Sequence, residues 1–225
     1  MNYITKFIAE KSNLPILNEI TNNNYHMFNT GGVECEVGEF LYSLVQIMKP
    51  KEILETGTYY GISSTYMGLA LKENGFGRIT TLDLTYHPEA KKIHLDLGLN
   101  SIINQIEINS LTFEPDTQYS LILLDTEPCI RFSEFKKFFD FLSPGGLIVI
   151  HDLHPHLSYS PDQNKDLPYP HWPFGNFIPD IGDKYIKEFN VQTFSFPTPR
   201  GITIFQKASD QMSYVTFLKQ IYDRI

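Results

Sequence analysis

Short apolar runs alternate with helix-like segments along the middle of the chain, and this alternation restricts the fold more than any other feature. The apolar runs are rich in aliphatic residues, and in the segments between them apolar residues recur every three or four positions. Strands that alternate with helices through short links indicate a parallel sheet with helices on both faces. The sequence therefore predicts a doubly wound α/β fold. We expect strands at 51–56, 78–84, 105–110, 119–125 and 146–152, and helices at 35–48, 63–75, 87–99 and 133–142.

The two ends of the chain depart from this alternation. Residues 1–34 predict an N-terminal helical segment that is interrupted at Pro15, and residues 209–225 place apolar side chains on one face of a C-terminal helix. No linker is long enough to separate domains, so we expect residues 1–225 to form a single domain. Apolar faces outside the sheet tend to be interfaces, which favours a homo-oligomer.

Two further segments follow the last of these strands. Residues 189–196 and 201–207 are strand-like and are joined by Pro-Thr-Pro-Arg, which predicts an antiparallel hairpin and brings the sheet to seven strands. Residues 153–182 are rich in Pro, His and Tyr and have no periodicity. A loop of this length is usually more than a connection. We expect it to cover a substrate, and a rigid surface loop is the equal alternative.

Composition restricts the partners of the protein. The chain has 225 residues and a net charge of -8, and no stripe of Lys and Arg offers a surface for nucleic acid. No apolar run approaches the ~20 residues of a membrane span, so we expect no membrane contact. The N-terminal residues do not resemble a signal peptide, which predicts a cytoplasmic protein. Cys35 and Cys129 show no metal-ligand spacing.

The stretch Ile-Leu-Glu-Thr-Gly-Thr-Tyr-Tyr-Gly-Ile-Ser-Ser, residues 53–64, ends a strand on a carboxylate and then turns through two glycines. A phosphate-binding loop would need a lysine after Gly61, and none is there. The dinucleotide-binding pattern needs a glycine two residues after Gly57, and the next one is four residues on. The pattern Glu-x-Gly-x-x-x-Gly-x-Ser remains. A nicotinamide-dependent oxidoreductase is the alternative that this spacing argues against.

Polar residues follow each strand of the predicted parallel sheet. In such sheets, ligands bind beyond the carboxyl ends of the strands, at the point where the strand order reverses. Because these ends meet at one edge, the polar residues together mark a binding site. They are Glu55, Asp83, Asn109, Ser110, Asp125, His151 and Asp152.

These motifs resemble those of the class I S-adenosylmethionine-dependent methyltransferases, and the resemblance covers roughly residues 30–207. The glycine loop within residues 53–64 looks particularly like that of the small-molecule O-methyltransferases of the catechol and caffeoyl-CoA type. Leu-Ser-Pro-Gly-Gly-Leu-Ile-Val-Ile-His-Asp, residues 142–152, is similar to the turn and fifth strand of the same superfamily. The resemblance implies the Rossmann-like methyltransferase fold and methylation of a hydroxyl group on a small molecule. A non-catalytic protein that binds S-adenosylmethionine remains an alternative.

The resemblance also implies how S-adenosylmethionine binds. Gly57 and Gly61 would let the backbone approach the cofactor, and Asp83 would accept hydrogen bonds from the ribose hydroxyls. The methionine carboxylate would lie near Ser63, at the start of the next helix. The adenine would lie beside Ser110. The implied cofactor residues are Glu55, Gly57, Tyr59, Gly61, Ser63, Asp83 and Ser110.

Asp125 and Asp152 match the two aspartates that hold a divalent cation in the catechol-type enzymes, which implies a magnesium site. Two departures from that pattern concern the same site. Leu153 stands where the third ligand, an asparagine, would be, and Pro128 stands where the lysine base would be. His151 is then the candidate general base, with or without metal help.

Overall fold

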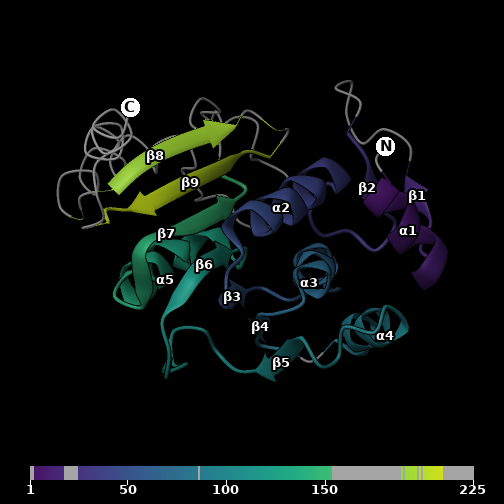
Figure 1. Cartoon of the computed structure of the whole chain (residues 1–225), viewed down its shortest axis with the longest axis horizontal. Helices are drawn as coiled ribbons and strands as arrows, with labels where there is room; N and C mark the ends of the chain where they lie inside the picture. Colours follow the sequence, from purple (N-terminus) through teal and green to yellow (C-terminus); the bar gives the residue numbers. More distant parts are fainter. Residues whose placement is uncertain are drawn as a thin grey trace, which may run out of the picture.

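The computed structural model describes residues 3–17, 25–85, 87–153, 189, 191–196, 198 and 200–209. Seven strands form one mixed sheet in the order β5-β4-β3-β6-β7-β9-β8 (Figure 1). The first five of these are parallel, whereas β9 is antiparallel to both of its neighbours. The expected α/β class, the seven strands and the C-terminal antiparallel hairpin are confirmed. The strands are β3 (Glu52–Thr56), β4 (Arg78–Asp83), β5 (Ile103–Glu107), β6 (Tyr119–Leu124), β7 (Leu142–His151), β8 (Val191–Phe196) and β9 (Ile202–Lys207).

The strand order reverses at β3. Its neighbours are β4, the next strand in the chain, on one side and β6 on the other, and it is parallel to both. The connections that leave β3 and β6 therefore diverge, which opens a crevice for a ligand at the carboxyl ends of these two strands. The glycine loop leaves β3 at this point.

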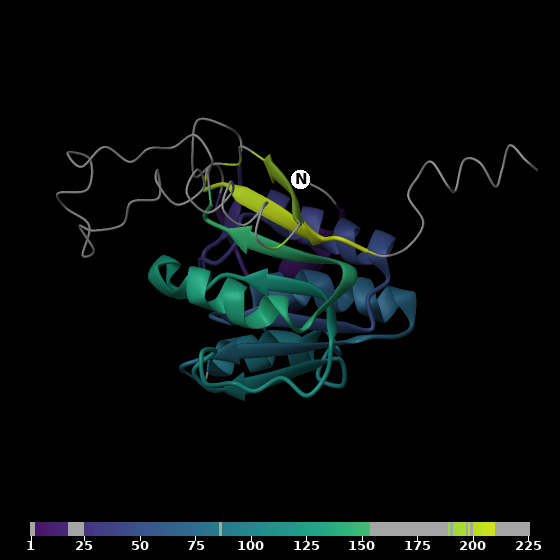
Figure 2. The ribbon, with the colours of Figure 1, turned by 90° about the vertical axis from the view of Figure 1, so that its left-hand side faces the viewer.

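Helices cover both faces of the sheet (Figures 1 and 2). Alternate strand residues point to opposite faces, so Ile53 packs in the core beneath α2, α3 and α4, whereas Leu54 packs in the core beneath α5. The central strands β3 and β6 are thus buried on both sides, which explains why they read as nearly continuous apolar runs. The helices are α1 (Tyr3–Ser12), α2 (Cys35–Met48), α3 (Ile62–Asn74), α4 (Pro88–Asp96) and α5 (Pro128–Phe139).

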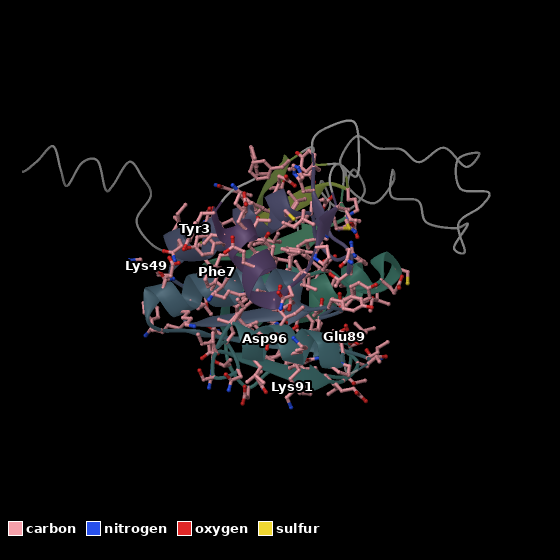
Figure 3. The ribbon with its side chains drawn as sticks, turned by 90° about the vertical axis from the view of Figure 1, so that its right-hand side faces the viewer. Tyr3, Phe7, Lys49, Glu89, Lys91 and Asp96 are labelled. Carbon is pink, nitrogen blue, oxygen red and sulfur yellow. The ribbon has the colours of Figure 1, made fainter. Side chains whose placement is uncertain are left out.

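The N-terminal segment contains one helix and a small two-stranded sheet. Ile4 and Ile8 of α1 are buried in the same core as α2 and α3, and the aromatic rings of Tyr3 and Phe7 stack at 6.3 Å near the outer surface (Figure 3). The apolar face of α1 is therefore covered by its own chain. The strands β1 (Ile16–Leu17) and β2 (Met27–Phe28), which pair antiparallel, were not expected from the sequence. Homo-oligomerisation stays a prediction.

Two elements begin four or five residues before their expected starts. The helix expected from Ser133 begins at Pro128, because proline fits the first helical turn, where no N–H partner is needed. The strand expected from Gly146 begins at Leu142. Tyr119 pairs with Leu142 and Leu121 already pairs with Leu147, so a bulge absorbs the Ser-Pro-Gly-Gly turn within β7.

The remaining expectations concern segments that lie largely outside the described residues. The substrate-covering insert falls there from residue 154 on, and the C-terminal helix from residue 210 on. The single-domain assignment stays a prediction for the same reason. Among the helices that the structure describes, none combines the length and apolar character needed to cross a membrane.

Candidate active site

The predicted site residues lie at one edge of the sheet. Glu55 is the last residue but one of β3, and Asp125 directly follows β6. Asp83 ends β4, and His151 ends β7. These four strands are neighbours and parallel, so their carboxyl ends lie side by side. The structure thus brings the predicted polar residues together around the reversal point.

The glycine loop packs directly against the end of β6. Gly57 has φ +87°, and a Cβ atom there would lie 2.3 Å from the carbonyl oxygen of Asp125. Its N–H donates to the carbonyl of Leu82, at 2.8 Å. A larger residue at this position would therefore separate the loop from β6 and β4. The glycine thus allows close packing of the predicted cofactor loop against the backbone of Asp125.

The second glycine is held by a buried histidine on α4. Gly61 has φ +72°, and a Cβ atom there would lie 2.7 Å from Nε2 of His94. That nitrogen lies 3.3 Å from the carbonyl oxygen of Gly61 and 3.2 Å from Oγ of Ser64. Burial lowers the pKa of His94 to about 4, so the imidazole is neutral. This histidine, which the sequence analysis did not single out, fixes the start of α3.

Glu55 is fully buried behind the loop. One carboxylate oxygen accepts a hydrogen bond from Oγ of Ser63, and the other accepts one from Oγ1 of Thr81, both at 2.5 Å. Burial raises the pKa of Glu55 to about 7, although these hydroxyl donors oppose the shift. The carboxyl group is therefore poised between its two protonation states, and its hydrogen bond to Ser63 ties β3 to α3.

Asp83 accepts hydrogen bonds from two backbone N–H groups. Its Oδ2 accepts a hydrogen bond from the N–H of Tyr59 at 2.8 Å, and its Oδ1 accepts one from the N–H of Thr85 at 3.2 Å. Tyr59 has φ +45°, an uncommon conformation for a tyrosine, and its ring packs edge-on against Tyr60 and His87. The carboxylate thus holds the glycine loop in shape and remains partly exposed at the end of β4.

Ser110 is buried beside a second buried carboxyl group, that of Glu134 on α5. Burial raises the pKa of Glu134, and the nearby hydroxyl of Ser110 opposes this shift. Oε2 of Glu134 also accepts hydrogen bonds from Thr126 at 2.6 Å and from Thr56 at 3.3 Å. Glu134 therefore ties α5 to the ends of β3 and β6.

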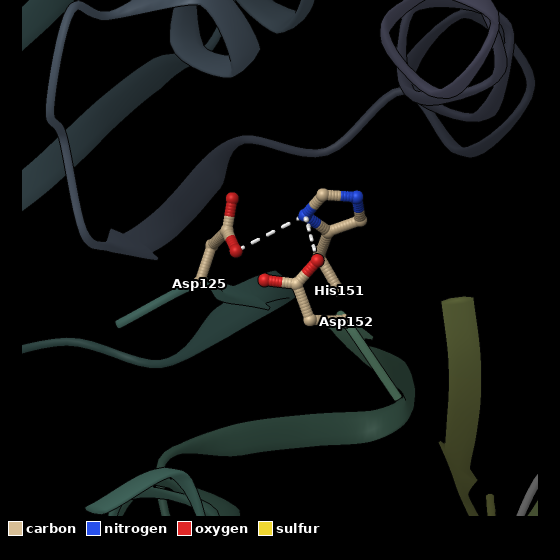
Figure 4. A group of neighbouring side chains, drawn as sticks. All are labelled: Asp125, His151 and Asp152. Carbon is tan, nitrogen blue, oxygen red and sulfur yellow. Dashed lines mark hydrogen bonds and ion pairs between the residues drawn. The ribbon is translucent and has the colours of Figure 1, made fainter. Parts of the chain in front are cut away.

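His151 is fully buried between three carboxylates, of which Figure 4 shows those of Asp125 and Asp152. Its Nε2 lies 2.8 Å from Oε2 of Glu34, and its Nδ1 lies 3.1 Å from Oδ1 of Asp125 and 3.6 Å from Oδ1 of Asp152. Burial disfavours the charged imidazole, but the carboxylates, Asp125 foremost, outweigh burial and raise the pKa of His151 to about 9. The imidazole is therefore a cation at neutral pH.

The same contacts keep the carboxylates ionised. Burial would raise the pKa of Glu34, but the hydrogen bond and charge of His151, together with Arg200, lower it to about 2. Burial likewise opposes the charge of Asp125, and His151 and Arg131 hold its pKa below the usual range. The carboxylates of Glu34 and Asp125, together with their basic neighbours, therefore form a network of paired charges.

Arg131, on α5, inserts between the two aspartates. It is 4% exposed, and its Nη2 lies 3.2 Å from Oδ1 of Asp125 and 3.3 Å from Oδ2 of Asp152. Its Nε donates to the carbonyl of Thr126 at 2.7 Å, and its Nη1 donates to the carbonyl of His151. The guanidinium thus bridges the ends of β6 and β7.

A second arginine closes the network from the hairpin. Nε of Arg200 lies 3.2 Å from Oε1 of Glu34 and 3.3 Å from Oδ1 of Asp152. Asp152 itself has φ +56°, a left-handed conformation that directly follows the end of β7.

The predicted magnesium site does not fit these contacts. Ligand atoms of Asp125, His151 and Asp152 do lie within 4.8 Å of one another. A metal-bound histidine, however, needs a lone pair on the coordinating nitrogen, and both ring nitrogens of His151 face carboxylate oxygens. The aspartates, in turn, already share the guanidinium of Arg131.

The central part of the chain matches the model of a known domain family, described as a methyltransferase domain, over residues 54–153. The matched range covers less than half of the chain. It contains every residue that the sequence analysis singled out as a cofactor, catalytic or metal residue. Glu34 and Arg200, which complete the charge network, lie outside the matched range.

Relatives and solved structures agree with this assignment. A protein of Mycobacterium sp. (strain JLS) that carries the name O-methyltransferase is 29% identical over 129 residues, which are 54% of this chain and 57% of that protein. A Dictyostelium discoideum protein with the name caffeoyl-CoA O-methyltransferase 1 is 23% identical over 191 residues, 81% of this chain and 79% of that protein. The match thus spans little more than half the length of the mycobacterial relative.

The fold has a counterpart among crystal structures. The O-methyltransferase from Bacillus cereus in complex with S-adenosylhomocysteine superimposes with a TM-score of 0.63, at 18% identity, over 92% of this chain and 91% of that one. The expected Rossmann-like methyltransferase fold is therefore confirmed.

Sequence reasoning missed Glu34, Arg131 and Arg200. Glu34 directly precedes α2 and resembles an ordinary acidic residue at a helix start, and Arg200 lies in a turn that carries no local signal. Arg131 was detectable in principle. Had Pro128 been taken as the start of α5, Arg131 would have been placed in the first turn, beside the carboxyl ends of the strands.

Proposed function

We propose that the protein transfers a methyl group from S-adenosylmethionine to a hydroxyl group of a small molecule. The observation that carries this proposal is the glycine loop, which leaves β3 at the reversal point and hydrogen-bonds to Asp83 at the end of β4. The methyltransferase domain match and the bound S-adenosylhomocysteine in the Bacillus cereus enzyme support the choice of cofactor.

The proposed cofactor position follows from the loop. The ribose hydroxyls would hydrogen-bond to the partly exposed carboxylate of Asp83, and the adenine would lie towards Ser110. The amino-acid part would extend towards Ser63 and the start of α3, where free N–H groups favour a carboxylate. Its ammonium group would lie on the side of Glu55, and a cation there favours the ionised form of that carboxyl group.

Methyl transfer is an in-line displacement. The acceptor oxygen forms a bond to the methyl carbon while the bond from sulfur to that carbon breaks, and sulfur keeps the electron pair. Most of the rate can come from holding these atoms in line. The hydroxyl proton must leave, and we propose that the carboxylate of Asp125 hydrogen-bonds to this hydroxyl, accepts its proton as the new bond forms and passes it on to water. The hydrogen bonds from His151 and Arg131 both end on its Oδ1, which leaves Oδ2 for the acceptor.

His151 has a different part in this proposal from the one expected. A general base must be unprotonated and within reach of the proton that it takes. His151 is buried, and contacts with Glu34 and Asp125 occupy its two nitrogens. We therefore propose that it positions Asp125 instead of removing the proton itself. Magnesium at Asp125 and Asp152 has no step in this proposal.

Calorimetry with S-adenosylhomocysteine tests the cofactor, with NADH as the competing ligand. We expect binding of the first and none of the second; the reverse would favour an oxidoreductase. Transfer of a labelled methyl group to a panel of small hydroxylated compounds then tests the reaction. Tight cofactor binding without transfer to any acceptor would favour a non-catalytic binding protein.

A further inference from the structure

We propose that Arg131 is the resident cation of the acceptor site, in the place that the catechol-type pattern gives to a divalent metal ion. The inference rests on the proposed function, because it concerns how the same site is charged. It predicts a site that is built for methyl transfer and takes no metal. Arg131 is a positioning residue in this scheme, since its contacts are with the two aspartates and with backbone carbonyls.

The position of the guanidinium is the first argument. Asp125 and Asp152 are the two residues that match metal ligands, and a single nitrogen, Nη2 of Arg131, lies within 3.3 Å of a carboxylate oxygen from each. A metal ion bound to both aspartates would need that same space. Carbonyl groups of Thr126 and His151 hold the other two nitrogens, so the side chain is fixed from three directions.

The charge of the cluster is the second argument. Three carboxylates, those of Glu34, Asp125 and Asp152, face the guanidinium groups of Arg131 and Arg200 and the imidazole of His151. The two guanidinium groups alone leave at most one negative charge in the cluster. A divalent ion added to this cluster would leave an excess of positive charge in a largely buried place, which is unfavourable.

The contacts of His151 are the third argument. Its Nδ1 faces Oδ1 of Asp125 (Figure 4), and its Nε2 faces Oε2 of Glu34. Both ring nitrogens are therefore already engaged by carboxylate oxygens. A metal ion held jointly by Asp125, His151 and Asp152 would have to break the contact between His151 and Asp125.

The arginine gives the site a constant charge. A guanidinium stays protonated at any pH at which the protein is folded, and it cannot be removed by a chelator. Its Nη2 orients two carboxylates, as a metal ion would, but the guanidinium offers no open coordination position to the acceptor. The acceptor hydroxyl would thus be activated by alignment and by hydrogen bonding to Asp125.

Binding of Mn²⁺, followed by electron paramagnetic resonance, tests the inference without an activity assay. We expect no Mn²⁺ binding by the wild-type protein at millimolar concentrations. Arg131→Met frees both carboxylates and should gain binding of Mn²⁺, which Asp125→Asn in the same background should abolish. Arg78→Met is the matched control, because Arg78 pairs with Glu52 on the surface, and it should leave Mn²⁺ binding absent.

Stoichiometric Mn²⁺ binding by the wild-type protein that is lost in Asp125→Asn would overturn the inference. So would a folded Arg131→Met protein that gains no binding. Should Arg131→Met fail to fold, the wild type and Arg131→Lys decide, and binding by either counts against the proposal. S-adenosylhomocysteine binding, measured on the same samples, keeps a failure here distinct from a failure of the proposed function.

Discussion

Nε2 of His151 lies 2.8 Å from Oε2 of Glu34, although 117 positions separate the two residues in the sequence. Both side chains are fully buried, and the contact joins the end of β7 to the segment that precedes α2. Breaking a buried charge pair of this kind strongly destabilises a protein, because the remaining partner stays buried without a compensating charge. The pair therefore couples the N-terminal segment to the predicted catalytic edge.

This pairing predicts a pH dependence of stability at alkaline pH. The folded protein raises the pKa of His151 from 6.5 to about 9, so the contribution of the charged imidazole is fully present below pH 6.5. It is lost as pH rises through about 9, because the folded state then releases a proton that the unfolded state has already lost. The loss is on the order of 3 kcal/mol in the free energy of unfolding.

Urea unfolding of the wild type and of His151→Gln between neutral and alkaline pH measures this contribution. The difference in unfolding free energy between the two proteins should shrink as pH rises. A difference that stays constant over this range would show that His151 is neutral in the folded protein.

Asp83→Ala should weaken binding of S-adenosylhomocysteine. The variant removes the proposed acceptor for the ribose hydroxyls and also the partner of the Tyr59 N–H. We expect a loss of about 1.5–3 kcal/mol, or a roughly 10- to 150-fold higher Kd by calorimetry. Asp96→Ala, which removes an exposed carboxylate paired with Lys92 on α4, is the control and should bind normally. Unchanged affinity in a folded Asp83→Ala protein would remove Asp83 from the cofactor site.

Gly61→Ala should destabilise the protein more than Gly75→Ala does. The two glycines have similar dihedral angles, φ +72° and φ +78°, so each alanine costs about 1–2 kcal/mol for the left-handed conformation. A Cβ atom at Gly61 also lies 2.7 Å from Nε2 of His94, whereas one at Gly75 meets nothing within 4 Å. We expect a further cost of about 1–3 kcal/mol at Gly61. Equal thermal stabilities of the two variants would mean that His94 moves aside freely.

Glu55 should release protons when the cofactor binds. Its pKa is raised to about 7 in the folded protein, so its neutral form stabilises the fold below pH 4.5, and this contribution is lost as pH rises through about 7. An ammonium group placed beside it would favour ionisation. Calorimetry with S-adenosylhomocysteine just below neutral pH, in buffers of different ionisation enthalpy, measures the protons released.

The wild type should release part of a proton per ligand bound, and Glu55→Gln should release none. Equal release by both proteins would assign the proton to another group. The same variant should flatten the stability curve between pH 4.5 and about 7.

Local sequence patterns determined the layout of this protein. The helix predicted at 35–48 matches α2, because its apolar residues recur at helical spacing and Pro50 closes it. The alternation of strands and helices determined the parallel sheet, and parallel strands place their carboxyl ends at one edge. Glu55, Asp83, Asp125 and His151 could therefore be assigned to one site from the sequence.

The charges at that site were decided only by the tertiary structure. An isolated histidine has a pKa near 6.5, and nothing near His151 in the sequence indicates that Glu34 faces its far nitrogen. Arg131 and Arg200 reach Asp152 from a helix and a hairpin that are far apart in the sequence. Contacts between such distant segments leave no local periodicity, yet they set the protonation of His151 and fill the space between the two aspartates.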